Sequence, residues 1–209
     1  MSKKNENEEE EIKVILIGDS GVGKTNLINT SVGLKFNQAE NPTVSGSFVS
    51  KNIIINDKKY IINLWDTAGQ EVYRGITQLF YRGAEIVVLV YDICSLSSFN
   101  SLEEWYEISE DTINTEHIYG IVGNKNDLFL ESKTNEDDAK KFAESKKAKF
   151  KLVSAKEDPQ GFVDFIEDLV IDYKKINKVF RKQTLKIDRK KSVNNNNNKE
   201  NCFKCQNNA

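Results

Sequence analysis

Short apolar runs alternate along most of the chain with segments whose apolar residues recur at helical spacing. Continuous apolar runs predict buried strands, whereas apolar positions three and four residues apart predict amphipathic helices. We therefore expect strands over 12–17, 47–56, 59–65, 86–91, 118–123 and 150–153. Helices are expected over 24–32, 70–81 (irregular), 98–112, 134–147 and 160–178. This alternation predicts an α/β fold with a mostly parallel, six-stranded sheet and helices on both of its faces.

Three local signals refine this outline. A hairpin turn near Asn56-Asp57 joins the second and third strands, which predicts one antiparallel pair in the sheet. Thr134 to Asp137 resembles a capping box that opens the fourth helix, with Asp137 in place of the usual Glu. Residues 33–50 show no clear periodicity. A loop of this length is usually functional, so we expect it to become ordered when a ligand binds.

Residues 18–25 read Gly-Asp-Ser-Gly-Val-Gly-Lys-Thr and lie between the first expected strand and the first expected helix. This is the context that the phosphate-loop pattern G-x-x-x-x-G-K-[ST] requires, although a tight turn without a ligand is the alternative. Glycines let backbone N–H groups turn around a phosphate, and the helix adds its positive dipole end. Lys24 would contact the β- and γ-phosphates, and Thr25 would bind Mg²⁺. The expected phosphate-side residues are Asp19, Ser20, Gly21, Val22, Gly23, Lys24, Thr25 and Asn26.

The segment at the end of the third expected strand indicates how the γ-phosphate would be bound and hydrolysed. Asp66 ends that strand and would hold a magnesium-bound water. Gly69 would offer its N–H to the γ-phosphate, so its position would depend on whether that phosphate is present. Gln70 would orient the attacking water. Lys24 and Gln70 are therefore the expected catalytic residues.

Two further segments indicate which base is bound. Asn124-Lys125-Asn126-Asp127 follows an apolar strand, and the Asp127 carboxylate can accept both the N1–H and the exocyclic amine of guanine. Adenine offers no such donor pair, so it would leave the carboxylate unpaired. Asn124 would bridge either to the base or to the phosphate loop, and the Lys125 stem would cover the ring. In Ser154-Ala155-Lys156 the Ala155 N–H would donate to the guanine oxygen.

In this order, the motifs resemble those of the Ras superfamily of small GTPases and, within it, the Rab family. The Rab resemblance depends on three strings, Trp65-Asp66-Thr67-Ala68-Gly69-Gln70-Glu71, Phe80-Tyr81-Arg82-Gly83-Ala84 and Leu89-Val90-Tyr91-Asp92-Ile93. It covers about residues 11–176. It implies a P-loop NTPase G domain that acts as a GTP/GDP switch, hydrolyses GTP slowly and recruits effectors in vesicle trafficking. A nucleotide-dependent adaptor with negligible hydrolysis is the alternative.

The resemblance also implies roles for single residues. Phe36 would pack edge-on against the guanine, and Thr43 would bind Mg²⁺ and sense the γ-phosphate. The implied effector interface comprises Val44, Phe48, Trp65 and Phe80. Ordinary core packing is the alternative for the three aromatic rings. The implied partners are an exchange factor, a GTPase-activating protein, effectors, a GDP-dissociation inhibitor and a prenylation escort protein.

Several positions depart from the Rab pattern. The stretch 44–48 reads Val-Ser-Gly-Ser-Phe, so the acidic residue usual before the phenylalanine is missing and the glycine is displaced. Val72-Tyr73 replaces the usual Arg-Phe, whereas Cys94 and Val153 replace threonines. None of these changes removes an expected nucleotide or metal ligand, so they bear on which partners bind.

Composition fits one switch domain in a reducing compartment. The chain has 209 residues with 30 basic and 32 acidic side chains, a net charge of −2, so no overall field favours nucleic acid. The 3 cysteines argue against a disulfide framework. No apolar run is long enough to span a bilayer, and the acidic start is neither a signal nor a transit peptide. The single histidine, His117, is expected in a solvated loop, which excludes histidine metal sites and Ser-His-Asp catalysis. We expect an acidic disordered segment over 1–11 and the GTPase domain over 12–178.

Residues 179–209 form a basic, asparagine-rich segment that is expected to be a disordered tail. It carries eight basic and two acidic residues, a local charge of +6, and a run of asparagines over 194–198. Such a segment is attracted to anionic membranes, but stable anchoring needs a lipid as well. Cys202 and Cys205 are the candidate prenylation sites by analogy with Rab tails, although four residues follow Cys205. The protein is therefore expected to be cytoplasmic and, when lipidated, peripheral on the cytoplasmic face of an intracellular membrane.

Overall fold

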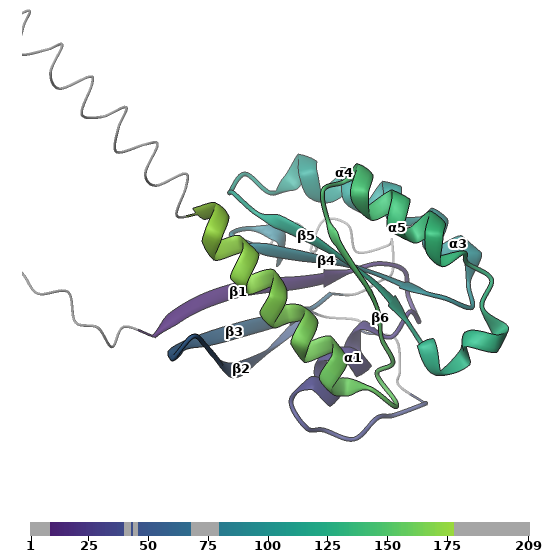
Figure 1. Cartoon of the computed structure of the whole chain (residues 1–209), viewed down its shortest axis with the longest axis horizontal. Coiled ribbons are helices and arrows are strands. Elements are labelled where there is room, and N and C mark those ends of the chain that lie inside the picture. The colour runs from purple at the N-terminus through teal and green to yellow at the C-terminus, as the bar shows by residue number, and fades with distance from the viewer. Residues whose placement is uncertain (1–8, 40–42, 44–45, 68–79, 178–209) are drawn as a thin grey trace, which may run out of the picture. The chain divides into compact units, whose positions relative to one another are not determined.

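A computed structural model describes residues 9–39, 43, 46–67 and 80–177 (Figure 1). The strands are β1 (Glu10–Ile17), β2 (Ser47–Ile55), β3 (Lys58–Asp66), β4 (Ile86–Asp92), β5 (Ile118–Asn124) and β6 (Lys149–Leu152). The helices are α1 (Lys24–Ser31), α3 (Leu96–Asn100), α4 (Leu102–Thr112), η2 (Asn126–Glu131, a 3₁₀ helix) and α5 (Glu136–Ser145), and a further helix covers 159–177. The chain separates into two compact units, 1–173 and 174–209, and the sheet belongs to the first.

The six strands form one sheet in the order β2-β3-β1-β4-β5-β6. Only the β2–β3 pair is antiparallel, and the other neighbouring strands are parallel. This confirms the expected mostly parallel α/β sheet with one antiparallel pair. The parallel strands bring the loops after β1, β3, β5 and β6 to the same edge, where open α/β sheets bind ligands.

Both faces of the central strands are buried, which explains their continuous apolar runs. In β1, Val14 and Leu16 belong to a cluster that includes Leu27 of α1 and Phe165 of the helix 159–177. The alternate residues Ile15 and Ile17 belong to a second cluster with Leu102 and the alanines of α5. Figure 1 shows α3, α4 and α5 together on one side of the sheet. Helices therefore cover both faces, as expected.

The hairpin between β2 and β3 has the expected two-residue turn. Asn56 and Asp57 have φ angles of 50° and 60°, and the flanking residues Ile55 and Lys58 are paired. Positive φ at both central residues is the geometry that fits the twist of a hairpin, and Asn and Asp tolerate it better than most residues.

The expected helix 98–112 is wrong in detail, because two helices, α3 and α4, meet at Ser101. The break falls in a serine-rich stretch, in which hydroxyl groups compete for backbone partners. The Ser101 hydroxyl donates to the Ser97 carbonyl at 3.0 Å, and the Ser95 hydroxyl accepts from the Ser98 N–H at 3.3 Å.

The capping box at Thr134 is also wrong. The N-cap of α5 is Asn135, whose side-chain oxygen accepts a hydrogen bond from the Asp137 N–H at 2.8 Å. The Thr134 hydroxyl instead donates to the Ile93 carbonyl at 3.3 Å. The helix therefore begins two residues later than expected.

The first strand and the segment after β5 also differ from the sequence prediction. Strand β1 begins at Glu10, two residues before the expected start, and Lys58 and Lys59 form ion pairs with Glu10 and Glu9. The 3₁₀ helix η2 was not expected. Of the expected helix 70–81, only residues 80 and 81 are described, and both are helical. Among the described residues, no helix is both long and apolar enough to cross a lipid bilayer.

Replacing Asp57 by valine should destabilise the fold by about 1–2 kcal/mol, because a β-branched residue is strained at positive φ. Asp57 is exposed, so burial does not change. Urea denaturation would measure the loss. The matched control is Asp57→Gly, because glycine adopts this φ without strain, so this variant should be more stable than Asp57→Val. Equal stability of the valine and glycine variants would contradict the turn geometry.

Candidate nucleotide-binding site

A cavity of about 390 Å³ opens where the loops after β1, β5 and β6 meet. Thirteen of its lining residues were expected from the sequence, namely Ser20, Gly21, Gly23, Lys24, Thr25, Asn26, Phe36, Thr43, Asn124, Lys125, Asp127, Ala155 and Lys156. Three were not expected, namely Gln38, Thr67 and Leu128. The phosphate-side and base-side motifs, about 100 residues apart in the chain, therefore line one cavity.

Two glycines of the phosphate loop are required by their surroundings. Gly18 has a φ of 145°, and a Cβ atom there would lie 2.1 Å from the Val90 carbonyl oxygen. Gly23 has a φ of 98°, and its Cβ would lie 2.3 Å from Nδ2 of Asn124. Since backbone and a buried amide leave no room for a side chain, the loop can pass between β4 and Asn124 only with glycine at these positions.

The Lys24 ammonium lies inside the loop. Its Nζ donates to the carbonyls of Gly18 and Asp19 at 2.6 and 2.8 Å, and the residue is 5% exposed. Burial lowers the pKa of Lys24 to about 8, and the attraction of the Asp66 and Asp19 carboxylates opposes this only in part. The hydrogen-bond acceptors of this buried ammonium are neutral backbone carbonyls. A polyphosphate bound beside it would therefore supply negative charge in direct contact with the lysine.

Three oxygen-bearing side chains from three segments meet beside Lys24. The Thr25 hydroxyl donates to Oδ2 of Asp66 at 2.8 Å, and the Thr43 hydroxyl lies 3.2 Å from the same oxygen. The two hydroxyl oxygens are 2.9 Å apart. Hydroxyl and carboxylate oxygens are the donors that Mg²⁺ prefers, and this cation commonly completes its shell with water and substrate phosphates. The donor set therefore fits the expected metal.

Asn124 connects the two halves of the cavity. Its Nδ2 donates to the Val22 carbonyl of the phosphate loop at 2.8 Å, and its Oδ1 accepts from the Ala155 N–H at 3.2 Å. Of the two roles left open for this side chain, the structure has the bridge to the phosphate loop. The Ala155 N–H, expected to meet the guanine oxygen, donates to Asn124 here.

The Asp127 carboxylate is held in place by Ser154. The Ser154 hydroxyl donates to Oδ1 of Asp127 at 2.6 Å and accepts from the N–H groups of Lys156 and Glu157 at 3.2 and 3.0 Å. Ser154 is buried and does not itself line the cavity. It therefore acts by orienting the carboxylate that was expected to recognise guanine.

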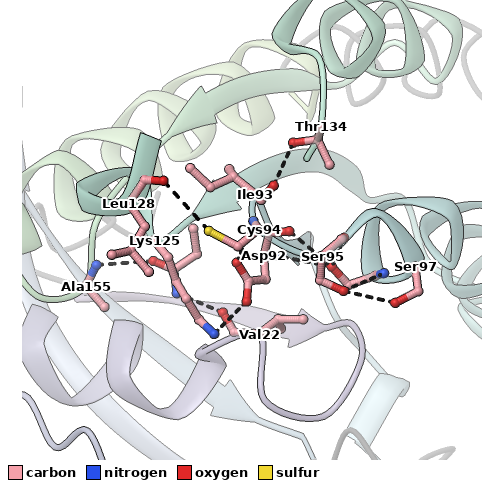
Figure 2. Close-up of polar contacts among 12 residues, drawn as sticks. Val22, Asp92, Ile93, Cys94, Ser95, Ser97, Lys125, Leu128, Thr134 and Ala155 are labelled. Carbon is pink, nitrogen blue, oxygen red and sulfur yellow. Dashed lines mark hydrogen bonds and ion pairs between the residues drawn. The ribbon is translucent and has the colours of Figure 1, made fainter. Parts of the chain in front are cut away.

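Lys125 is held by a partner that sequence reasoning missed. Its backbone has a φ of 68°, and its Nζ forms an ion pair with Oδ2 of Asp92 at 2.6 Å (Figure 2). The other oxygen of Asp92 accepts from the Cys94 N–H at 2.9 Å. Lys125 thus lines the cavity while its ammonium is fixed at the end of β4. An acidic residue directly after a buried strand was the signal that could have identified Asp92, as it did Asp66.

The loop after α1 is fastened by Asn26. The Asn26 amide donates to the Asn37 carbonyl at 2.9 Å and accepts from the Asn37 N–H at 3.0 Å. This pair places Phe36 and Gln38 at the cavity. Asn26 was expected on the phosphate side, and its contact with the loop that carries Phe36 was missed.

The remaining expected residues fall into two groups. Asp19, Val22 and Asp66 do not line the cavity, but each contacts a residue that does. Val44, Gly69, Gln70, Cys202 and Cys205 lie outside the described residues.

Three aromatic rings form a contiguous cluster where β2 begins and β3 ends. The Phe48 and Trp65 rings stack with centroids 4.9 Å apart, and the centroids of Trp65 and Phe80 are 5.7 Å apart. Phe48 is 54% exposed, whereas Trp65 packs partly against the core. The displaced Gly46 leaves room for Phe80, since a Cβ there would lie 2.4 Å from that ring. The cluster combines core packing with an exposed apolar surface.

Binding of GDP should take up protons above pH 8, because the neutral Lys24 amine must regain its charge beside the phosphates. Burial lowers the pKa of Lys24 to about 8. Affinity should therefore fall as pH rises above 8, by up to about tenfold per pH unit. Calorimetry at pH 9 in two buffers of different ionisation enthalpy measures the uptake. Lys24→Arg, which stays charged, should show none. Equal uptake in both proteins would contradict this role.

Comparison with known proteins agrees with the geometry. The family model described as the Ras family matches residues 13–175. The chain is 40% identical over 150 residues to Ras-related protein Rab-7a of Paramecium octaurelia, with 69% of this chain and 73% of that protein covered. It is 39% identical over 162 residues to Ras-related protein Rab11B of Nicotiana tabacum (78% and 75%), and 38% identical over 143 residues to GTP-binding protein ypt3 of Schizosaccharomyces pombe (68% and 67%). The chain therefore belongs to the Ras family and, within it, is a Rab-family small GTPase.

Proposed function

We propose that the cavity binds GTP with Mg²⁺ and that the chain hydrolyses this GTP slowly, as a Rab-like switch in vesicle trafficking. The observation that carries the proposal is that Lys24, Thr25, Thr43 and Asp127 line one cavity, with the Asp66 carboxylate bonded to Thr25 beside it. Each group has a chemistry that one part of GTP–Mg²⁺ requires.

On the phosphate side, the loop amides and Lys24 would neutralise the polyphosphate. Thr25 and Thr43 would hold Mg²⁺ directly and Asp66 through a water. When bound, this cation neutralises charge on the β- and γ-phosphates. The Thr25 and Thr43 hydroxyls already lie 2.9 Å apart, so few side-chain movements are needed to gather them. Thr43 would connect the loop that carries it to the presence of the γ-phosphate.

On the base side, Asp127 would accept the two donors of the guanine edge. Its orientation is fixed by the 2.6 Å bond from Ser154. Lys125 would cover one face of the base with its stem, and Phe36 would pack against it edge-on. An adenine in the same place would leave a carboxylate without donors, at a cost of several kcal/mol of binding energy, roughly 10⁴-fold in affinity.

Hydrolysis would proceed by in-line attack of water on the γ-phosphorus. A new P–O bond forms to the water oxygen, and the bond to the β–γ bridging oxygen breaks, giving GDP and inorganic phosphate. By family resemblance, Gln70 orients this water and no arginine of this chain reaches the γ-phosphate. Turnover should then be on the order of 10⁻⁴ s⁻¹, as for unassisted Ras, and an activating protein would supply the missing positive charge.

Effectors would bind the aromatic cluster formed by Phe48, Trp65 and Phe80. Val44, which is near Phe48 in sequence, would belong to the same interface. The ring contacts in the cluster and the 54% exposure of Phe48 support this assignment. By the same resemblance, the regulators are an exchange factor, an activating protein, a GDP-dissociation inhibitor and a prenylation escort protein.

Membrane attachment would come from the basic tail, with Cys202 and Cys205 as the lipid acceptors. A single lipid chain anchors weakly, so either two chains or one chain with the basic segment would be needed. The protein would then lie on the cytoplasmic face of an intracellular membrane.

Replacing Gln70 by leucine should lower single-turnover GTP hydrolysis at least tenfold, because the attacking water loses its orienting amide. GTP affinity should change less than twofold, since the base and phosphate contacts remain. Release of phosphate from preloaded protein measures the rate. Wild-type turnover in the variant would contradict the role of Gln70. If the wild-type protein bound GTP but did not hydrolyse it, even with cell extract, the adaptor alternative would hold.

Replacing both Cys202 and Cys205 by serine should release the full-length, N-terminally tagged protein from membranes. Cell fractionation and imaging would show the change, and the two single variants would show whether one lipid chain suffices. Cys94→Ser is the matched control and should stay membrane-bound. Retention of the double variant on membranes would rule out these cysteines as the anchor.

A further inference from the structure

The first helical turn after Ser101 reaches back to the phosphate loop. Trp105 of α4 donates its indole N–H to Oδ1 of Asp19 at a distance of 2.8 Å. The two residues are 86 positions apart, and both are half-buried. A hydrogen bond to an ionised carboxylate is stronger than one between neutral groups. Neither of these side chains lines the cavity, so the contact cannot act by touching a nucleotide there.

Asp19 is held on two sides. Its carbonyl oxygen accepts from the Lys24 ammonium at 2.8 Å, and its carboxylate accepts from Trp105. The preceding residue, Gly18, packs so closely on β4 that a Cβ atom there would lie 2.1 Å from the Val90 carbonyl oxygen. Three contacts therefore hold the start of the phosphate loop in place. They come from the Lys24 ammonium, the Val90 carbonyl of β4 and the Trp105 indole. Of these three contacts, only the indole comes from a helix that is distant in sequence and does not itself begin in the phosphate loop.

Helix α4 is a rigid support for the indole. Leu102 is fully buried, and the Ser109 hydroxyl lies 2.9 Å from the Tyr119 hydroxyl of β5. Lys146, at the end of α5, also forms an ion pair with Glu103 of α4, with 2.5 Å between its Nζ and Oε1 of the glutamate. A donor mounted on such a helix loses little conformational freedom when it forms its bond.

We propose that Trp105 is a positioning residue of the phosphate loop, whose bond to Asp19 holds the loop in its binding shape and slows nucleotide release. The inference rests on the proposed binding of guanine nucleotide at this site. Without the bond, the Asp19 carboxylate would be hydrated by water instead. The backbone of Gly18 and Asp19 would then adopt further conformations in which the N–H groups of the loop no longer point toward one phosphate position. Because these N–H groups would bind the phosphates and not the base, loss of the bond should speed nucleotide release and leave the preference for guanine unchanged.

The test is the dissociation rate of fluorescently labelled GDP, chased with excess unlabelled GDP from the preloaded full-length protein. Trp105→Phe keeps a ring and removes the donor, and Asp19→Ala removes the acceptor. Each should release GDP roughly three- to tenfold faster, which is less than the full loss of a charged hydrogen bond because the bond acts on the nucleotide only through the loop. The double variant should be no faster than the faster single variant, because both changes remove the same bond.

Two further variants separate positioning from general destabilisation. Asp19→Asn keeps an acceptor oxygen and should recover most of the retention that Asp19→Ala loses. Tyr106→Phe, the next residue on α4, removes a hydroxyl that makes no described hydrogen bond and should release GDP at the wild-type rate. The ratio of GDP to ADP affinity should stay the same in Trp105→Phe, as measured by competition.

Unchanged release from Trp105→Phe, or single effects that multiply in the double variant, would overturn the inference. A wild-type protein that does not retain labelled GDP at all would overturn the proposed function instead. The two failures are therefore distinguishable in one experiment.

Discussion

The rest of the site depends on the buried side-chain amide of Asn124. This residue is 1% exposed, and both ends of its amide are used, one on the Val22 carbonyl and one on the Ala155 N–H. Leaving a buried polar group without a partner costs about 1–3 kcal/mol, so the phosphate loop and the base loops cannot separate without loss. Gly23 makes the contact possible, because any side chain there would occupy the place of the amide.

Around this fixed bridge the two halves are built differently. On the base side, side chains are locked by neighbours outside the cavity: Asp127 by Ser154 and Lys125 by Asp92. On the metal side, Thr43 reaches Thr25 and Asp66 from a loop that is fastened at Asn37 by Asn26. A base pocket with fixed side chains, beside a loop that would contact Mg²⁺ and the γ-phosphate, would suit a switch, since nucleotide would stay bound while the loop responds to one phosphate.

Much of the fold and site could be predicted because the information is local. The central strands β1, β4 and β5 are nearly continuous apolar runs, and the phosphate and base motifs directly follow strands, so topology brings the motifs together. The break at Ser101 and the Asn135 cap were missed because several polar residues in a row can each bond to the backbone, and packing decides which one does. The Lys125–Asp92 and Trp105–Asp19 contacts join residues 33 and 86 positions apart, and periodicity carries no information about such pairs.

One cavity is expected to bind the polyphosphate of a nucleotide and to recognise its guanine base. The most direct measurement is displacement of labelled GDP from the wild-type protein by unlabelled GTP and by ATP, in the presence of Mg²⁺. GTP should compete at least roughly 10³-fold better than ATP, because only guanine satisfies the Asp127 carboxylate. Equal competition by the two nucleotides would contradict this expectation.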